Sequence, residues 1–282
     1  MSGIVTLTTD FGTEDAYAGT MKGVILSINP QAQLVDLTHS VAPQRVLEGS
    51  YLLATAFRYF PKGTVHLAVV DPGVGSARRA LAVQAGGYFF VAPDNGILSH
   101  VLAVLGLAHP GGPGSPTSTN LASGMRAVAL TNPAFWLHPV SATFHGRDIF
   151  SPVAARLSLG HDLTEFGEDV PALLLYPLSS ASTGPDGSTE GTVVHVDHFG
   201  NLVTDIRVEA LPSGPVEVRV AGRVIRGLSL SYADAAVDPA FALLAIEGSE
   251  GYLDLAVRDG NAAALLGIGV GEPVRVLPAV TD

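Results

Sequence analysis

The sequence contains no cysteine among its 282 residues, which excludes disulfides, thiolate metal ligands and a cysteine nucleophile. Basic residues are also few: 15 Lys and Arg stand against 26 Asp and Glu, giving a net charge of −11, and the only lysines are Lys22 and Lys62. This charge balance disfavours nonspecific nucleic-acid binding, so we expect no nucleic-acid partner. No apolar run reaches the roughly 18 residues of a membrane helix and no basic leader opens the chain, so we expect a cytoplasmic protein without a membrane partner.

Charged residues make up only 15% of the chain, against about 25% in an average protein. Much of the surface is therefore small, apolar or covered, which hints at an oligomer. The hydrophobic fraction of 47% is ample for a core, and the length suggests close to two domains.

The first half of the chain alternates strand-like and helix-like segments. Residues 4–8 are apolar and β-branched, and the next apolar residues recur at helical spacing over residues 17–28. A second strand at 33–37, a helix at 46–60 and a continuous apolar run at 64–70 complete a βαβαβ pattern. We therefore predict an α/β N-terminal domain with a mainly parallel sheet.

A boundary follows this domain, because residues 179–191 are almost all small or polar. Beyond it the chain has short β-type runs divided by glycine-containing turns. The sequence predicts an α/β domain at 1–178, a linker at 179–191 and a smaller antiparallel β-barrel domain at 192–282.

Three predicted strands end in polar segments, which parallel strands would bring to one edge of the sheet. Asp10 follows the first strand and is suited to hold a ribose diol, ligate a metal or cap the next helix. Asp36 and His39 follow the second strand. Asp71 follows the third, and Arg78 lies seven residues on, across a glycine turn that can fold the two into an ion pair.

Two further segments combine polar and aromatic residues. His145 lies in the polar run TFHGRD, directly before a helical stretch. The segment from Asp197 to Asn201 places Phe199 between an acid and an amide, which suits either base recognition or an ordinary hairpin turn. A metal site built from Asp10, Asp15, Asp36 and His39 is a further alternative, although no tight metal-ligand spacing supports it.

Seven segments follow one another along the chain: TTDFGTEDAYAGTMKG, VDLTHSVAP, AVVDPGVGSARR, APDNGILS, TFHGRDIFSPVAA, VDHFGNLVT, and GYLDLAV with GNAA after it. In this order they resemble the S-adenosylmethionine hydroxide adenosyltransferases, the family that also contains fluorinating and chlorinating enzymes. The resemblance spans nearly the whole chain. It implies a parallel-sheet N-terminal domain, a β-barrel C-terminal domain, and a homotrimer whose active sites lie between the N-terminal domain of one chain and the C-terminal domain of the next.

The resemblance also implies roles for individual residues. Asp10 corresponds to the ribose-diol carboxylate, Asp197 to the acid near the methionine amine and Asn201 to the amide that reads the adenine edge. The remaining substrate-binding positions that it implies are Phe144, Phe199, Tyr232, Ser249, Glu250 and Ala262. Glu250 replaces an arginine of the halogenating members, and Gln44 replaces a tryptophan.

The polar triad of the water-using members is matched here by Asp71, Arg78 and His145, whereas the halogenating members carry tyrosine at the Asp71 position. A carboxylate at this position repels halide and accepts a hydrogen bond from water. We therefore predict hydrolysis of S-adenosylmethionine to adenosine and methionine by in-line attack of water or hydroxide on C5′, without metal or cofactor. The alternatives are a metal-dependent phosphohydrolase and a non-catalytic trimer that binds S-adenosylmethionine or adenosine.

Overall fold

The structure is a computed structural model that describes residues 2–107, 114–233 and 243–279. The chain divides into two compact units, Met1–Leu178 and Ser179–Asp282. None of the helices in the described residues has the length and apolar character needed to cross a membrane.

The N-terminal unit is built on a six-stranded sheet with the order β2-β1-β3-β5-β4-β7. The pairs β2–β1, β1–β3 and β3–β5 are parallel, and β5–β4 and β4–β7 are antiparallel. The strands of this sheet are β1 (Ile4–Thr9), β2 (Gln33–Thr38), β3 (Val65–Val69), β4 (Ala80–Ala85), β5 (Tyr88–Pro93) and β7 (Arg126–Ala129). A separate two-stranded sheet pairs β6 (Thr117–Asn120) with β8 (Ala172–Leu175).

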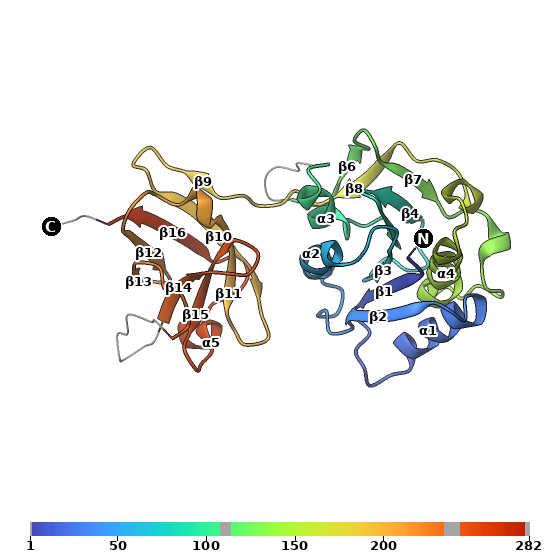
Figure 1. The fold of residues 1–282 in the computed structure, drawn as a ribbon, viewed down its shortest axis with the longest axis horizontal. Helices are drawn as coiled ribbons and strands as arrows, with labels where there is room; N and C mark the ends of the chain where they lie inside the picture. Colours follow the sequence, from blue (N-terminus) through green and yellow to red (C-terminus); the bar gives the residue numbers. More distant parts are fainter. Residues whose placement is uncertain (1, 108–113, 234–242, 280–282) are drawn as a thin grey trace. The chain divides into compact units, whose positions relative to one another are not determined.

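Helices cover both faces of the six-stranded sheet (Figure 1). The helices α1 (Tyr17–Ile28) and α4 (Ser151–Leu159) share one core with one face of the sheet, and α2 (Val46–Ala56) and α3 (Ser99–Val104) share another core with the opposite face. Short helical turns complete the unit: η1 (Phe57–Tyr59), η2 (Pro133–Phe135), η3 (Gly146–Phe150) and η4 (Leu163–Phe166). Because both faces are covered, β3 and β5 are buried along their whole length, which explains their continuous apolar runs.

The C-terminal unit is an eight-stranded antiparallel sheet that curls into a nearly closed, barrel-like form (Figure 1). Its strand order is β13-β12-β16-β10-β11-β15-β14, with β9 paired to β10. The elements are β9 (Ser182–Thr183), β10 (Thr189–Val196), β11 (Leu202–Arg207), η5 (Val208–Ala210), β12 (Val216–Val220), β13 (Arg223–Arg226), β14 (Leu243–Glu247), β15 (Tyr252–Val257), α5 (Ala262–Leu266) and β16 (Pro273–Pro278). The predicted fold class, an α/β domain with a mainly parallel sheet followed by a smaller antiparallel barrel, is confirmed.

Candidate active site

The carboxyl ends of the parallel strands β1, β2 and β3 carry the polar segments singled out in the sequence. β1 lies between β2 and β3 in the sheet, so the three ends are adjacent. Asp10 follows β1 directly, Asp36 lies near the end of β2, and Asp71 comes two residues after β3. This edge is where open α/β sheets bind their ligands.

Asp71, Arg78 and His145 form one hydrogen-bonded cluster at this edge. Arg78 donates from Nε to Asp71 Oδ1 at 3.0 Å and from Nη2 to Asp71 Oδ2 at 2.5 Å. The same Nη2 lies 2.9 Å from Nδ1 of His145, which is 67 residues away in the chain. The structure therefore brings together all three residues of the predicted triad.

The backbone between Asp71 and Arg78 explains how the cluster forms. Two successive turns, from Val74 N–H to the Asp71 carbonyl and from Ser76 N–H to the Gly73 carbonyl, reverse the chain so that Arg78 returns to Asp71. Gly75 has a φ of +76°, and a Cβ there would lie 2.4 Å from the carbonyl oxygen of Ala142. Only glycine permits this close approach, which brings the segment carrying His145 against the loop.

The contact with Arg78 fixes the proton arrangement of His145. A guanidinium only donates hydrogen bonds, so Nδ1 of His145 accepts and the neutral ring carries its proton on Nε2. Burial lowers the pKa of His145 below its ordinary value of 6.5 and the Arg78 charge adds to this, outweighing the opposing effects of Asp71 and Asp148. His145 is therefore a neutral ring that offers an N–H donor.

Phe144, the residue before His145, belongs to an aromatic cluster beside this edge. Its ring lies 5.9 Å from that of Phe11 and 5.2 Å from that of Tyr17, both edge-on. Phe11 directly follows Asp10, and Phe144 directly precedes His145. The contact between the Phe11 and Phe144 rings therefore brings the backbone at Asp10, the predicted ribose carboxylate, close to the backbone at His145. Asp10 itself accepts a hydrogen bond at Oδ2 from the backbone N–H of Gln44 at 2.8 Å.

The C-terminal unit gathers a second group of predicted residues around the turn from Asp197 to Asn201. Asp197 Oδ1 accepts from the backbone N–H groups of Phe199 and Asn201, and Oδ2 accepts from the Asn201 amide at 2.8 Å. Asn201 is buried, whereas the Phe199 ring is 71% exposed. The hydrogen bonds of the turn thus fix the carboxylate of Asp197 and the amide of Asn201, and the ring of Phe199 beside them is exposed.

Helix α5 and Asn261, the residue before it, pack against this turn. Gly200 has a φ of +84°, and a Cβ there would lie 2.1 Å from the Asn261 side chain. The Gly200 carbonyl accepts a hydrogen bond from Ala263, which places the fully buried Ala262 next to the turn. Ala262, one of the predicted substrate-binding positions, thus lies beside the turn with its side chain fully buried.

Ser249 and Glu250 lie in the turn between β14 and β15, closed by a hydrogen bond from Gly251 N–H to the Gly248 carbonyl. Arg207 donates to the Glu250 carbonyl at 3.3 Å, and its guanidinium lies 4.1 Å from the centre of the Tyr252 ring. The main chain at Glu250 is thus held by a cation, although its side chain is acidic.

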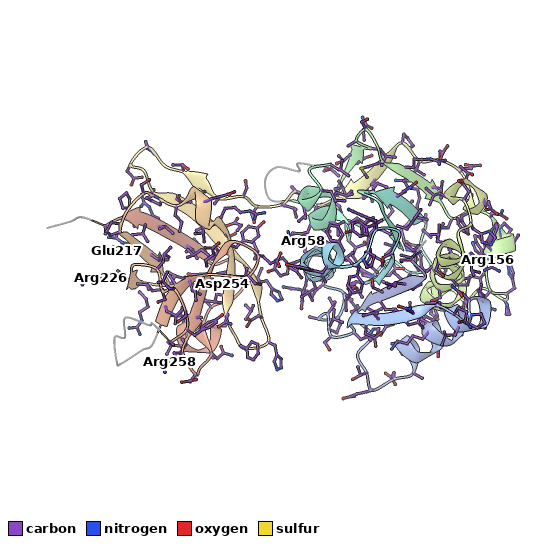
Figure 2. The ribbon with its side chains drawn as sticks, viewed as in Figure 1. Arg58, Arg156, Glu217, Arg226, Asp254 and Arg258 are labelled. Atoms are coloured by element: carbon purple, nitrogen blue, oxygen red, sulfur yellow. The ribbon has the colours of Figure 1, made fainter. Side chains whose placement is uncertain are left out.

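Asp254 was not predicted from the sequence; it lies on β15 (Figure 2). Its carboxyl group interacts electrostatically with Asp197 and Tyr232. Burial, and secondarily the Asp197 charge, raise the pKa of Asp254 to about 7. Its Oδ1 is buried and has no hydrogen-bond partner among the described residues. The signal in the sequence is the alternation Leu253, Asp254, Leu255, which turns the carboxyl away from the core that buries both leucines.

Two of the four residues of the metal-site alternative, Asp36 and His39, contact each other and other side chains. His39 Nε2 lies 3.0 Å from Asp36 Oδ1, while its Nδ1 lies 2.8 Å from the Thr9 hydroxyl. Asp36 is also paired with Lys22 at 2.5 Å. Within residues 2–107, 114–233 and 243–279, no group of three or more His, Asp or Glu is arranged to hold a metal ion.

Comparison with known proteins identifies relatives over nearly the whole chain. Residues 5–167 match the family model of the SAM hydroxide adenosyltransferase N-terminal domain, and residues 191–275 match that of the C-terminal domain. A protein of Salinispora tropica named (R)-S-adenosyl-L-methionine hydrolase is 39% identical, covering 96% of this chain and 97% of its own. A fluorinase of Actinopolyspora mzabensis is 26% identical over 97% of this chain and 96% of its own.

A crystal structure shows the same fold. It is that of an uncharacterized conserved protein from Thermotoga maritima, with a TM-score of 0.84 and 32% identity, covering 98% of this chain and all of that one. The two family models thus match the two units of the chain, the N-terminal model the first unit and the C-terminal model the second.

Proposed function

The chain belongs to the SAM hydroxide adenosyltransferase family, and on that premise we propose that it hydrolyses S-adenosyl-L-methionine to adenosine and L-methionine. The name of its relatives specifies the (R) form. Since the L prefix already fixes the amino-acid carbon, (R) refers to the sulfonium centre. The proposed substrate is therefore the (R)-sulfonium epimer.

The observation that carries the proposal is the Asp71–Arg78–His145 cluster at the sheet edge. Water or hydroxide attacks C5′ in line with the C5′–S bond; the C5′–O bond forms, and the C–S bonding electrons leave with the neutral thioether of methionine. The sulfonium is already an activated leaving group, so the protein has to orient the nucleophile and accept its proton.

The cluster assigns these tasks to different residues. Asp71 accepts the hydrogen bond or the proton of the attacking water, because each carboxylate oxygen has a second lone pair beside the one used by Arg78. His145 offers its Nε2–H to the water oxygen and does not act as the base, since Nδ1 is already used by Arg78. Arg78 holds both partners in place.

The remaining predicted residues bind the substrate in this proposal. Asp10 and Phe144 contact the ribose and its surroundings; Phe199, Asn201, Tyr232 and Ala262 hold adenine; Asp197, Ser249 and Glu250 hold the amino-acid end. We further propose a homotrimer in which neighbouring chains complete each other's sites, and a cytoplasmic location that cell fractionation tests.

The test is to incubate the purified full-length protein with each sulfonium epimer separately, in the presence of EDTA, and to quantify adenosine and methionine by chromatography. We expect both products in equal amounts from the (R) epimer without added metal. Adenosine at the level of the protein-free control would contradict the proposal, and binding without turnover would identify the non-catalytic alternative. No turnover of either epimer, together with EDTA-sensitive hydrolysis of a phosphate ester such as p-nitrophenyl phosphate, would favour the phosphohydrolase alternative.

A further inference from the structure

Three hydrogen bonds tie the chain around Asp10 to the segment that follows β2: two join main-chain groups, and the third runs from a main-chain N–H to the Asp10 carboxylate. Gly12 N–H donates to the His39 carbonyl at 2.8 Å, Val41 N–H donates to the Thr9 carbonyl at 3.4 Å, and Gln44 N–H donates to Asp10 Oδ2 at 2.8 Å. Among the described residues, Asp10 Oδ1 accepts no hydrogen bond. One carboxylate oxygen is thus anchored and the other is left for a ligand.

Gln44 makes its contact from a conformation that is rare for a side-chain-bearing residue. Its φ is +67°, in the left-handed region, which costs a non-glycine residue about 1 kcal/mol or more. The segment therefore aims its N–H at Asp10 against a local conformational preference, and the surrounding contacts must hold it there.

The side chain of His39 connects the two segments a fourth time. It is 7% exposed, and its Nδ1 lies 2.8 Å from the Thr9 hydroxyl, whose oxygen accepts the backbone N–H of Phe11 at 3.3 Å. Thr9 and Phe11 are the two neighbours of Asp10 in the chain. His39 thus fixes the backbone on both sides of the carboxylate.

The other ring nitrogen of His39 is held from the opposite side. Nε2 lies 3.0 Å from Asp36, which is paired with Lys22 at 2.5 Å. Partial burial works to raise the pKa of Asp36, but its interactions with Lys22 and His39 outweigh it, and its pKa falls below 3.8. The 3.0 Å contact of Asp36 with Nε2 is not aligned as a hydrogen bond, but the charge of an ionised Asp36 favours the tautomer with the proton on Nε2. In that tautomer Nδ1 accepts the Thr9 hydroxyl proton.

We infer that His39 is a positioning residue that acts through Thr9 and the backbone of residues 9–12 to hold Asp10 where it binds the ribose diol. This inference rests on the proposed function, in which Asp10 binds the ribose. A carboxylate recognises two hydroxyls only when it is held to within about 0.5 Å of the right place. Lys22, Asp36, His39 and Thr9 form a continuous chain of contacts that supplies this restraint.

The inference makes a prediction about sugar specificity that a purely structural role would not make. Without the restraint, Asp10 loses its advantage for ribose, whereas a nucleoside that lacks the 2′-hydroxyl has less to lose. The affinity ratio of adenosine to 2′-deoxyadenosine should therefore fall in the His39 and Thr9 variants, with a smaller loss of affinity for 2′-deoxyadenosine, which offers Asp10 only its 3′-hydroxyl.

The chain offers a matched control in His66. Its Nδ1 also lies 2.8 Å from a threonine hydroxyl of β1, that of Thr6, and the ring is fully buried. Its ring is surrounded by Phe57, Phe60, Tyr88 and Phe90. His66→Leu and Thr6→Val therefore remove the same kind of hydrogen bond from the same strand, away from Asp10.

The experiment measures the dissociation constants of adenosine and 2′-deoxyadenosine by calorimetry for the full-length wild type, His39→Leu, Thr9→Val, His66→Leu and Thr6→Val, alongside hydrolysis of S-adenosylmethionine and urea unfolding. We expect the affinity ratio to fall at least about fivefold in the first two variants and to stay at the wild-type value in the control pair. His39→Asn keeps a polar atom near the Nδ1 position and should restore most of the ratio. Thr9→Val preserves the shape of the side chain, so the affinity ratio can be measured in this variant even if His39→Leu does not fold.

An unchanged ratio in a folded Thr9→Val protein, or an equal loss of affinity for both nucleosides, would overturn the inference while leaving the proposed function intact. A wild type that neither hydrolyses S-adenosylmethionine nor distinguishes the two nucleosides would instead overturn the proposed function, and the inference with it.

Discussion

Arg78 binds Asp71 through two parallel hydrogen bonds, with side chains that are only 10% and 5% exposed. Such a pair is little weakened by solvent, and its fork geometry fixes the plane of the carboxylate. Because the second lone pair of each oxygen is left over, the pair orients Asp71 without using up its capacity to accept from water. The ion pair is therefore compatible with a catalytic carboxylate.

The first prediction concerns Asp71→Asn, which keeps the shape and removes the proton acceptor. We expect kcat to fall by about 10²- to 10⁴-fold, the usual contribution of a general base, with little change in the dissociation constant of S-adenosylmethionine. Single-turnover kinetics and calorimetry measure the two quantities. Since the charge that repels halide is also lost, high chloride should yield traces of 5′-chloro-5′-deoxyadenosine.

Asp94→Asn is the control for this variant. Asp94 is likewise buried and pairs with Arg79, whose side chain is 37% exposed, at 2.5 Å and 2.8 Å; it also accepts from the Leu174 backbone. Its loss should destabilise the fold without a comparable drop in kcat. An Asp71→Asn protein that turns over at the wild-type rate would remove Asp71 from the mechanism.

The fold class was predictable because each local pattern of apolar residues indicates one type of helix or strand. Strand β3, Val65–Val69, is fully buried because helices cover both faces of the sheet, as the continuous apolar run at 64–70 indicates. Strand β6, Thr117–Asn120, carries no such signal, since its residues are small, polar and mostly exposed. Its existence depends on pairing with β8, more than 50 residues later in the chain.

The candidate site was predictable only in part. The contact of Asp71 with Arg78 follows from a short glycine turn, but the contact of Arg78 with His145 depends on tertiary packing at Gly75, and only the family resemblance indicated it. The proton arrangement of His145 and the raised pKa of Asp254 also depend on neighbours distant in the chain.

The second prediction concerns Asn201, whose amide donates to Asp197 and retains a second N–H and its oxygen for a purine edge. Asn201→Ala should weaken S-adenosylmethionine binding by about 1–3 kcal/mol, roughly 5- to 150-fold, because a buried polar edge loses its partner. Its kcat at saturation should change much less. Calorimetric titration checks this, and wild-type affinity would place adenine elsewhere.

The third prediction concerns assembly. Charged residues make up only 15% of the chain, and the proposed sites need two neighbouring chains. Light scattering should therefore give about three times 29.0 kDa. An active monomer at assay concentration would contradict shared sites.

The fourth prediction follows from two largely buried histidines of the N-terminal unit. Burial lowers the pKa of His66 to about 3 and that of His100 to about 4, from 6.5. Between these values and pH 6.5 the unfolded chain binds more protons than the folded one, so stability should fall as the pH drops below 6.5. The loss is about 2 kcal/mol per histidine at pH 5, and urea unfolding at several pH values should show a smaller slope for His100→Gln.

The last prediction concerns the C-terminal unit, where the opposite pH dependence is expected: stability falls as the pH rises. The pKa of Asp254 is raised from 3.8 to about 7 by burial and by Asp197, so between these values the folded state holds a proton that the unfolded state has released. Its contribution to stability is therefore complete below about pH 4 and is lost as the pH rises through 7. Asp254→Asn keeps the shape but cannot ionise, and it should raise the free energy of unfolding at pH 8 relative to wild type by about 1–3 kcal/mol, allowing for solvent screening. Near pH 4 the two proteins should be equally stable. Urea unfolding of the full-length wild type and variant at several pH values measures the difference, and a pH-independent gap between the two proteins would show that Asp254 does not titrate in this range.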